Sequence, residues 1–469
     1  MPSRLPLSSA VRLVPCRTLW VVLFALAVGC GGPLRELHPL SGDEFTLFPP
    51  ERGAPRPLEC ATGTEEQRFA CLAEEAQRMS EDEDLAGAFA VATPDGQIRA
   101  RALADSLNRD AHAIDADTRF PVGSVTKMFV GAAAASLSLE GALDLHQPIA
   151  RFLPELSERR GVGQATMHQL LTHTSGLGNP EQCEDADDDL ADMLERHGHQ
   201  PLWSPPGALM NYSNVGYSFA ALVIERVTGK PFEQVTRERV LVLAGLGDAS
   251  FGPDHALVRG HRTGPVVPRC RALWPSGGLL LSARELARWA HVLASPETSP
   301  LGRSLVELLT SPHVSLDGRP GAAYGYGVMR FEHGGLQILH HGGRLQDFSA
   351  LVAWSPERRL GVAALANTSE MVVMPAGFRA LSTFLALPHD WQPPRGPAHP
   401  LDAYTGIYRD EAGTLGRLRV SLEGEALVID YLDGPPPLLP PGFRFAFEPG
   451  QERATYVVTP VGVGKRVAQ

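Results

Sequence analysis

The sequence has no cluster of basic residues, and this absence is the first constraint on its function. Its 469 residues carry 42 lysines and arginines against 53 aspartates and glutamates, which gives a formal net charge of −11. Binding to a phosphate backbone requires a cationic face, so nucleic acid is not an expected partner. The sequence also lacks a His-Glu-x-x-His motif and a complete Gly-x-Ser-x-Gly elbow, because residues 216–220 end in alanine. A zinc site and a nucleophile elbow are therefore disfavoured, and no metal or organic cofactor is expected.

Disorder is also disfavoured by the composition. Apolar residues make up 43% of the chain and charged residues 20%, which is typical of a globular protein with a full core. The 47 glycines and 40 prolines together stay under a fifth of the chain. The length suits one large domain with appendages, or two to three ordinary domains.

Residues 1–30 carry the features of an export signal. No acidic residue precedes Glu36, and three arginines precede ten apolar residues, 19–28. That apolar run is too short for a comfortable membrane span. Its end, LAVGC, resembles the lipobox of bacterial lipoproteins, in which the cysteine (here Cys30) is lipidated after cleavage. We therefore expect an exported bacterial protein that is lipid-anchored to the cell envelope and faces the periplasm or the exterior. The alternative is cleavage after Ala27, which would release a soluble secreted protein.

Cysteine parity favours lipidation at Cys30. The chain has six cysteines, one of which lies inside the signal. Lipidation would leave four for pairing, whereas cleavage after residue 27 would leave five, and an odd thiol is unfavourable in an oxidising compartment. The pairing expected from position is Cys60 with Cys71 and Cys183 with Cys270.

The apolar patterns predict an α+β domain over residues 64–390, preceded by a flexible tether over 31–63 that is rich in proline and glycine. A helix and a hairpin about the Asp95-Gly96 turn open the domain, and a mostly helical middle follows. Four strand-like runs and a closing helix then bring the chain back to its first sheet. The expected helices are 64–79, 124 to about 141, 216–229, 282–294 and 375–387, and the late strands are 325–333, 336–343, 348–356 and 360–368.

Two segments follow the main domain. Residues 391–397 have the composition of a linker. Residues 398–469 contain short alternating runs, which predict a small β-rich module of about seventy residues, near the size at which a core alone is marginal.

An acidic loop over residues 184–192 imitates the start of a calcium loop, with aspartates at positions 185, 187 and 189. Its sixth position is Leu190 rather than glycine, and its twelfth is Arg196 rather than glutamate. A solvated acidic loop is the favoured interpretation, and no metal ligand is assigned.

Ser124 and Lys127 stand in FPVGSVTKMF, at the mouth of a long apolar run. A spacing of three on a helix puts both side chains on one face, one turn apart. The helix N-terminus supplies positive potential where an alkoxide would form, and a partly desolvated lysine can act as a base near neutral pH. The pair is either a nucleophile with its activator, or a helix-capping serine beside an unrelated surface lysine.

Further segments decide between these interpretations. The chain contains Tyr212-Ser-Asn214, the strand end His341-Gly-Gly343, and the stretches LLTHTSGL and PSGGLLLSARELARW. With the Ser-x-x-Lys motif, their order resembles that of the serine β-lactamase/penicillin-binding superfamily over about residues 64–390. The closest likeness is to the class C-like branch, which includes family VIII esterases and D-amino-acid peptidases. The resemblance implies a mixed sheet flanked by helices, with a mostly helical subdomain and the site between them.

The resemblance also implies a role for each motif residue. Ser124 would be the acylated nucleophile and Lys127 its proton acceptor, while Tyr212 would share the base role and protonate the leaving group. The remaining candidates would bind substrate or the oxyanion: Asn214, His341, Gly342 and Gly343 for the substrate, and the backbone N–H groups of Ser124 and Arg344 for the oxyanion. His173, inside LLTHTSGL, is expected to be structural, and His340 should face away from the site because neighbours alternate across a strand.

The histidine of the third motif bears most on the substrate. Lactamases and many penicillin-binding proteins carry Lys-Thr-Gly there, and lysine is a permanent cation for a substrate carboxylate, whereas histidine is mostly neutral near pH 7. We therefore expect an esterase-like serine hydrolase that forms an acyl-enzyme with a small-molecule or peptide ester or amide. The alternatives are a DD-peptidase or β-lactamase acting on cell-wall peptides or β-lactams, and a penicillin-binding or sensor protein that does not hydrolyse.

Overall fold

The structure, a computed structural model, describes most of the chain between residues 60 and 467. The described residues are 10–13, 60, 62–82, 85–103, 114–157, 161–179, 183, 187–252, 270–316, 322–345, 347–368, 373–387, 400–410, 416–424, 426–433, 444–446, 451–459 and 462–467. Cys30, the linker 391–397 and nearly all of the tether lie outside them.

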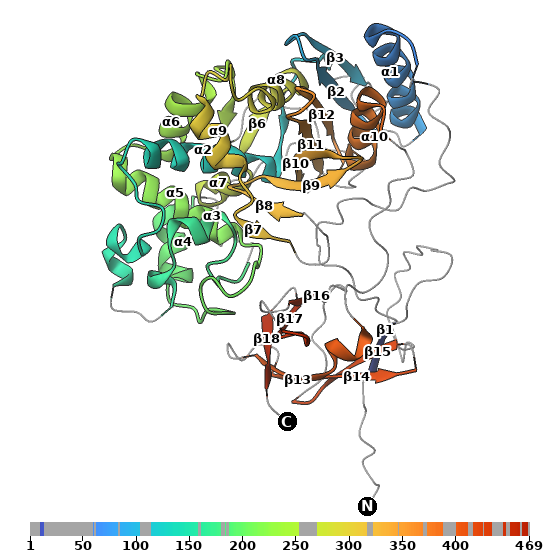
Figure 1. Ribbon diagram of the computed structural model, residues 1–469. Coiled ribbons are helices and arrows are strands. Elements are labelled where there is room, and N and C mark those ends of the chain that lie inside the picture. Colours follow the sequence, from blue (N-terminus) through green and yellow to red (C-terminus); the bar gives the residue numbers. More distant parts are fainter. Residues whose placement is uncertain are drawn as a thin grey trace, which may run out of the picture.

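An eight-stranded antiparallel sheet forms the centre of the main domain (Figure 1). Its strands, in spatial order, are β3 (Ile98–Leu103), β2 (Gly87–Ala92), β12 (Leu360–Ala366), β11 (Phe348–Ser355), β10 (Leu336–Leu345), β9 (Met329–His333), β8 (Ala323–Tyr324) and β7 (Val314–Ser315). The pairing of β12 with β2 returns the chain to its first hairpin, as the sequence predicted. The α+β fold expected from the sequence is thereby confirmed.

Alternate residues of the central strands belong to two separate cores, as the pleat of a strand requires. Val352 and Trp354 of β11 pack in the core that contains helix α8 (Ala283–Ala294). Leu351 and Ala353 face the opposite way, towards the closing helix α10 (Val373–Leu385) and the first helix α1 (Glu65–Asp82). The sheet is therefore covered by helices on both faces.

The second part of the main domain is helical and is built around α2 (Thr126–Leu139). Every residue of α2 from Thr126 to Ala135 is buried, which is typical of a helix enclosed on all sides. Phe129 of α2 stacks on Trp289 of α8 with ring centroids 4.3 Å apart, so α8 joins this part to the sheet. The helices around α2 are α3 (Met167–Leu171), α4 (Leu190–His197), α5 (Asn214–Thr228), α6 (Phe232–Thr236), α7 (Trp274–Gly277) and α9 (Arg303–Thr310). A small sheet of β4 (Phe120–Pro121), β6 (Leu279–Leu281) and β5 (Ser250–Phe251) adjoins them.

Several boundaries differ from the sequence prediction, and two of these differences lie in the helical part. Ser124 precedes the helix, because Gly123–Val125 form a 3-10 turn and α2 begins at Thr126. The acidic loop 184–192 was predicted three residues too long, since α4 begins at Leu190. Asp189 caps that helix by accepting hydrogen bonds from two backbone N–H groups of its first turn, so its carboxylate is used locally.

The C-terminal segment forms a separate antiparallel sheet. Its strands are β13 (Gly406–Asp410), β14 (Arg417–Glu423), β15 (Ala426–Tyr431), β16 (Arg444–Ala446), β17 (Tyr456–Thr459) and β18 (Gly462–Val467), with β1 (Ala10–Leu13) paired to β15 at one edge. Tyr456 and Val463 pack against Leu209 of the main domain. Among the described residues, no helix combines the length and apolarity that crossing a membrane demands.

Candidate active site

Ser124 and Lys127 lie together at the start of α2. The Lys127 Nζ atom is 3.1 Å from the Ser124 Oγ atom, as a spacing of three residues requires when both share one face. Lys127 is fully buried, whereas Ser124 is partly exposed. The hydroxyl can therefore meet a molecule from solvent while the amine remains enclosed behind it.

Lys127 is held from two further directions. Its Nζ atom lies 2.7 Å from the Asn214 Oδ1 atom and 2.9 Å from the carbonyl oxygen of Ser276. The ring of Tyr212 faces the same amine, with its centroid 4.7 Å from Nζ. The structure thus brings Ser124, Lys127, Tyr212 and Asn214 to one point. It adds the Ser276 carbonyl, which sequence reasoning missed because a backbone acceptor leaves no signature in the residue type.

The backbone nitrogens of Ser124 and Arg344 each lie close to a glycine of the facing segment. A methyl group at Gly343 would overlap the Val122 carbonyl oxygen and lie 3.2 Å from the Ser124 nitrogen. A methyl group at Gly123, whose φ is 52°, would lie 2.8 Å from the Arg344 nitrogen. Only glycines allow β10 to run this close to the 3-10 turn. The strand β10 and the 3-10 turn therefore run close together where the backbone nitrogens of Ser124 and Arg344 lie.

His173 packs against the second motif. It follows α3 with a left-handed φ of 59°, and its Nδ1 atom accepts a hydrogen bond of 3.0 Å from the Ser213 N–H. Its ring centroid lies 4.0 Å from that of Tyr212. Burial, with Lys127 nearby, holds the pKa of His173 well below its usual range, so the ring is neutral. Its position beneath Tyr212 agrees with the structural role expected from the sequence.

His341 is enclosed in the same region. It is fully buried, and its Nε2 atom lies 3.2 Å from the hydroxyl of Tyr324. Burial, reinforced by the charge of Lys127, lowers the pKa of His341 to about 3. Its neighbour His340 faces the other core, against Phe331 and Phe378, as alternation across a strand predicted. The third motif therefore presents a neutral ring and two glycines to the site.

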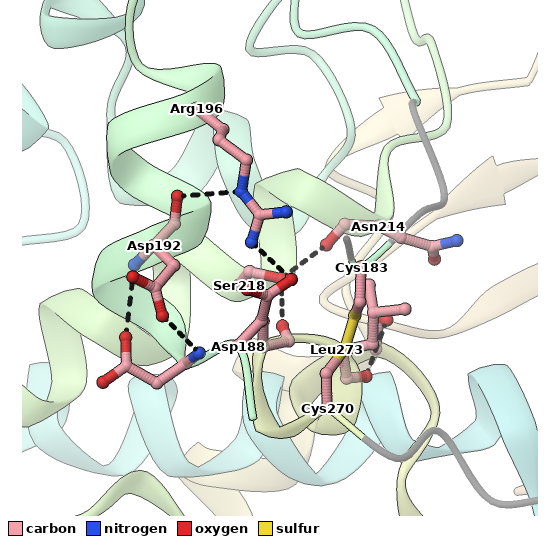
Figure 2. The surroundings of a disulfide bond; sticks show 11 residues. Cys183, Asp188, Asp192, Arg196, Asn214, Ser218, Cys270 and Leu273 are labelled. Carbon is pink, nitrogen blue, oxygen red and sulfur yellow. Dashed lines mark hydrogen bonds and ion pairs between the residues drawn. A yellow bond between two sulfur atoms is a disulfide. The ribbon is translucent and has the colours of Figure 1, made fainter. Parts of the chain in front are cut away.

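A disulfide anchors the segment that carries the Ser276 carbonyl. Cys270 begins this segment and is bonded to Cys183, with Cα atoms 6.4 Å apart, and Figure 2 shows the bond next to α5. Ser218 of α5 donates a 2.6 Å hydrogen bond to the carbonyl of Ala272. The second disulfide joins Cys60 to Cys71, with Cα atoms 5.3 Å apart. Both bonds have the pairing expected from position.

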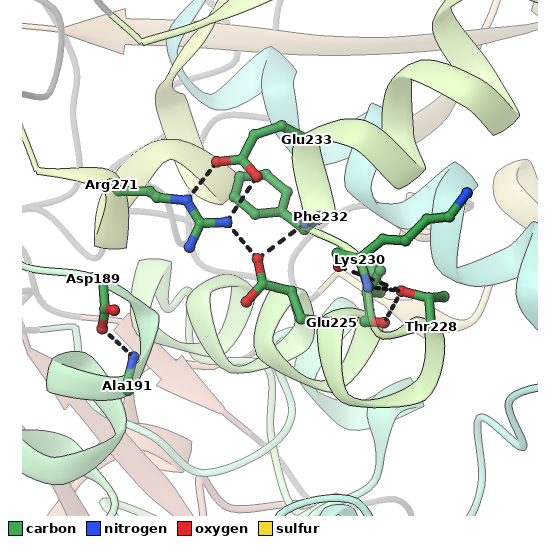
Figure 3. Close-up of polar contacts among 9 residues, drawn as sticks. Asp189, Ala191, Glu225, Thr228, Lys230, Phe232, Glu233 and Arg271 are labelled. Atoms are coloured by element: carbon green, nitrogen blue, oxygen red, sulfur yellow. Dashed lines mark hydrogen bonds and ion pairs between the residues drawn. The ribbon is translucent and has the colours of Figure 1, made fainter.

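Arg271 fixes the same segment from its other side. Its guanidinium binds both carboxylate oxygens of Glu233 and one of Glu225, while it lies over the ring of Phe232 (Figure 3). A forked, partly buried pair of this kind is geometrically specific. The backbone that reaches Lys127 is therefore held by a covalent bond and by a charged cluster.

Metal ligation has no support in the part of the chain that the structure describes. No group of three or more histidine, cysteine, aspartate or glutamate side chains there is arranged to hold an ion. The assembled groups are a hydroxyl, an amine, a phenol and backbone donors, and this set is suited to acyl transfer.

Comparisons with known proteins identify similar sequences and similar folds. The family model described as "Beta-lactamase" matches residues 72–381. "Protein flp" of Staphylococcus aureus (strain MW2) is 27% identical over 275 residues, which are 55% of this chain and 54% of that protein. "Esterase EstB" of Burkholderia gladioli is 34% identical over 212 residues, which are 40% of this chain and 53% of that protein. The chain thus spans about half the length of these curated relatives.

Solved structures share the fold over more of the chain. A structure of SurE has a TM-score of 0.67 at 22% identity and covers 86% of this chain and 100% of its own. The octameric penicillin-binding protein homologue from Pyrococcus abyssi gives 0.59 at 20%, with coverage of 83% and 96%. A D-stereospecific amidohydrolase from Streptomyces sp. gives 0.52 at 22%, with coverage of 68% and 99%. At these identities the likeness shows the fold.

Proposed function

Because this chain belongs to the β-lactamase family, whose members are generally serine hydrolases, we propose that it hydrolyses an ester or amide through an acyl-enzyme on Ser124. The observation that carries the proposal is the 3.1 Å contact between the Ser124 hydroxyl and the Lys127 amine, at a partly exposed serine and a buried lysine. A hydroxyl is a weak nucleophile until a base removes its proton.

Lys127 has three oxygen neighbours, so its amine can donate three hydrogen bonds as an ammonium and two as a neutral amine. Asn214 Oδ1 and the Ser276 carbonyl are acceptors only, so they take the two N–H groups of the amine. The third bond runs from Lys127 to the Ser124 oxygen; once Lys127 has lost that proton, its lone pair faces Ser124 and can accept the hydroxyl proton. In this arrangement Lys127 is the base that activates Ser124.

The reaction would proceed in two balanced steps. The Ser124 oxygen bonds to the substrate carbonyl carbon as Lys127 takes its proton, and the backbone N–H groups of Ser124 and Arg344 stabilise the oxyanion. The bond to the leaving group then breaks as Tyr212 passes it a proton, and Lys127 passes the proton from Ser124 on to Tyr212. Water attacks the acyl-enzyme in the second step, which releases the carboxylic acid and returns the proton to Ser124.

The proposed substrates have no essential carboxylate. His341 is neutral and hydrogen-bonded to Tyr324, so it offers no cation for a carboxylate. Arg344 is exposed, and its side chain lies on the strand face opposite to that of His341, because neighbours alternate along a strand. Recognition would then rest on Asn214 and the β10 backbone, which suits a neutral acyl group.

Variants at the two reacting groups test the proposal. Ser124→Ala and Lys127→Ala should each lower the hydrolysis of p-nitrophenyl esters by about a thousand-fold or more, as removal of a nucleophile or its base does in serine hydrolases. Lys230→Ala is the control, because that exposed lysine pairs with Glu238 in the helical part. Unchanged rates in both site variants would refute the assignment.

A fluorophosphonate or penicillin label followed over time separates the alternatives. Rapid labelling of Ser124 with fast ester turnover supports the esterase-like proposal. Nitrocefin hydrolysis faster than that of short esters would instead favour the β-lactamase or DD-peptidase alternative. A penicillin label that never leaves would favour the non-hydrolytic alternative.

We further propose that the protein is exported and anchored through Cys30. The two disulfides support this, because such bonds persist in oxidising compartments. Cys30→Ala should move the protein from the membrane fraction to the soluble fraction of expressing bacteria. Equal membrane fractions for both forms would refute the lipid anchor.

A further inference from the structure

A chain of four buried hydrogen bonds connects the second motif to the third through a tyrosine that belongs to neither. The Ser213 N–H bonds His173 Nδ1 at 3.0 Å, and His173 Nε2 lies 3.3 Å from the Tyr324 hydroxyl. That hydroxyl lies 3.2 Å from His341 Nε2, and His341 Nδ1 lies 2.5 Å from the Gly342 carbonyl oxygen. Both histidines and Tyr324 are fully buried.

The two ends of this series of hydrogen bonds fix the tautomer of each histidine. The Ser213 backbone N–H can only donate, so His173 carries its proton on Nε2 and donates it to the Tyr324 oxygen. The Gly342 carbonyl can only accept, so His341 carries its proton on Nδ1 and leaves Nε2 as an acceptor. Each ring thus has one tautomer, and Tyr324 accepts from His173. Its own proton can go to His341 or to the neighbouring hydroxyl of Tyr217, which itself donates to the Leu171 carbonyl.

None of the three side chains in this series of hydrogen bonds is charged at neutral pH. Burial, followed by the charge of Lys127, keeps the pKa of both histidines far below their usual range, and burial keeps that of Tyr324 far above its own. The same low-polarity surroundings make an unsatisfied donor or acceptor costly. The arrangement is therefore a fixed connection and does not switch at physiological pH.

The turn that follows Tyr324 packs against the helix that carries Lys127. It ends β8, and the following turn places Gly327 against the backbone of Lys127, where a methyl group would lie 2.7 Å from three backbone atoms. The ring of His173, oriented by Tyr324, supports the ring of Tyr212 at 4.0 Å. The Tyr324 hydroxyl thus contacts His173, which packs against Tyr212 of the second motif, and His341 of the third motif.

We propose that Tyr324 is a positioning residue for acylation: by bridging His173 and His341 it holds the Tyr-x-Asn motif and the His-Gly-Gly strand in register across the site. This role rests on the proposed function of Ser124. It adds a requirement beyond the reacting groups. The Tyr324 hydroxyl must hold the Tyr-x-Asn motif and the His-Gly-Gly strand in one relative position.

Removing that hydroxyl should lower the rate of acylation rather than substrate binding. In Tyr324→Phe, the His173 Nε2–H loses its acceptor and His341 Nε2 loses the neighbouring hydroxyl, and neither ring can reach solvent. The rings must then rotate, which displaces the support of Tyr212. We expect the rate of fluorophosphonate labelling and the kcat for esters to fall about ten- to a hundred-fold, with KM changed less than about three-fold.

Tyr326→Phe is the matched control. Tyr326 is two residues away and equally buried, and its hydroxyl bonds His168 Nδ1 at 2.9 Å, outside the chain that joins the motifs. Both variants remove one buried phenol oxygen, so their melting temperatures should fall by similar amounts. Only Tyr324→Phe should slow labelling.

A double-mutant cycle tests whether the connection acts as a unit. Asparagine at position 173 tolerates the left-handed backbone but is too short to reach Tyr324. The doubly substituted protein, with Tyr324→Phe and His173→Asn, should therefore be no slower than the slower single variant.

The outcomes separate this inference from the proposed function. Failure of the native protein to label would refute the role of Ser124 itself. Normal labelling of the native protein overturns the role of Tyr324 in any of three cases: Tyr324→Phe labels equally fast, Tyr326→Phe is slowed as much, or the two losses in the cycle multiply.

Discussion

Acidification should destabilise the main domain through His341. Burial and the charge of Lys127 lower the pKa of His341 to about 3, whereas an unfolded chain has a histidine pKa of about 6.5. Below pH 6.5, His341 therefore binds a proton in the unfolded chain but not in the folded protein. The contribution of this group to folding is complete above pH 6.5 and is lost progressively as the pH falls towards 3.

The loss can be worked out for one pH. At pH 4 the unfolded state gains about 3 kcal/mol from protonating this histidine, because each pH unit below 6.5 contributes about 1.4 kcal/mol. His168, whose pKa burial and the neighbouring His313 and His146 lower to about 4, adds a smaller amount because it is less enclosed. Domains are typically stable by about 5–15 kcal/mol, so these two groups remove a large share.

Urea unfolding measured between pH 7 and pH 4, with both disulfides oxidised, tests this reasoning. The unfolding free energy of the native protein should fall over that range, and His341→Gln should remove about 3 kcal/mol of the fall while being less stable at pH 7. His199→Gln is the control, because that side chain is exposed. An equal pH dependence in His341→Gln and the native protein would refute the neutral, enclosed state of His341.

Two further predictions concern the backbone around the site. Gly343→Ala should abolish fluorophosphonate labelling, because a methyl group there would overlap the Val122 carbonyl. Gly247→Ala is the control and should label normally, because a methyl group there meets open space. Normal labelling of both variants would contradict the close approach of β10. Replacing Cys183 and Cys270 together by alanine should cost about 4 kcal/mol in thermal or urea unfolding, since the bond closes a separation of 87 residues, and should also lower kcat. An unchanged kcat in a destabilised protein would show that the disulfide does not help to place the lysine's carbonyl acceptor.

Much of the fold was predictable because local and long-range preferences agree. Ser282 caps α8 through a capping box with Glu285, and Gly229 ends α5 with a φ of 66°, so both helix boundaries carried their own signals. The alternation along β11 placed its residues in two cores. Where prediction failed at the acidic loop, a signal existed: Asp189 and Asp192 form a capping box.

The site was predictable only where chemistry depends on residue type. Ser124, Lys127, Tyr212 and Asn214 are side-chain reagents in recognisable spacings, and they lie together. The Ser276 carbonyl could not be found in this way, because any residue type supplies it. Tyr324 escaped for another reason: its hydroxyl acts between two histidines that lie 151 residues before it and 17 residues after it, a relation that only the tertiary structure creates.

A neutral third motif suits the enclosure of the base. An unpaired charge is costly to bury, and two positive charges enclosed in one region also repel each other. Lys127 occupies that region and acts on His341 through its charge, while the acceptors of Lys127 named above are neutral oxygens. A second permanent cation at position 341 would raise the cost of protonating Lys127 and of folding together. A neutral ring avoids this cost, and its hydrogen bond to Tyr324 then fixes the strand that a cation would otherwise have fixed through the substrate.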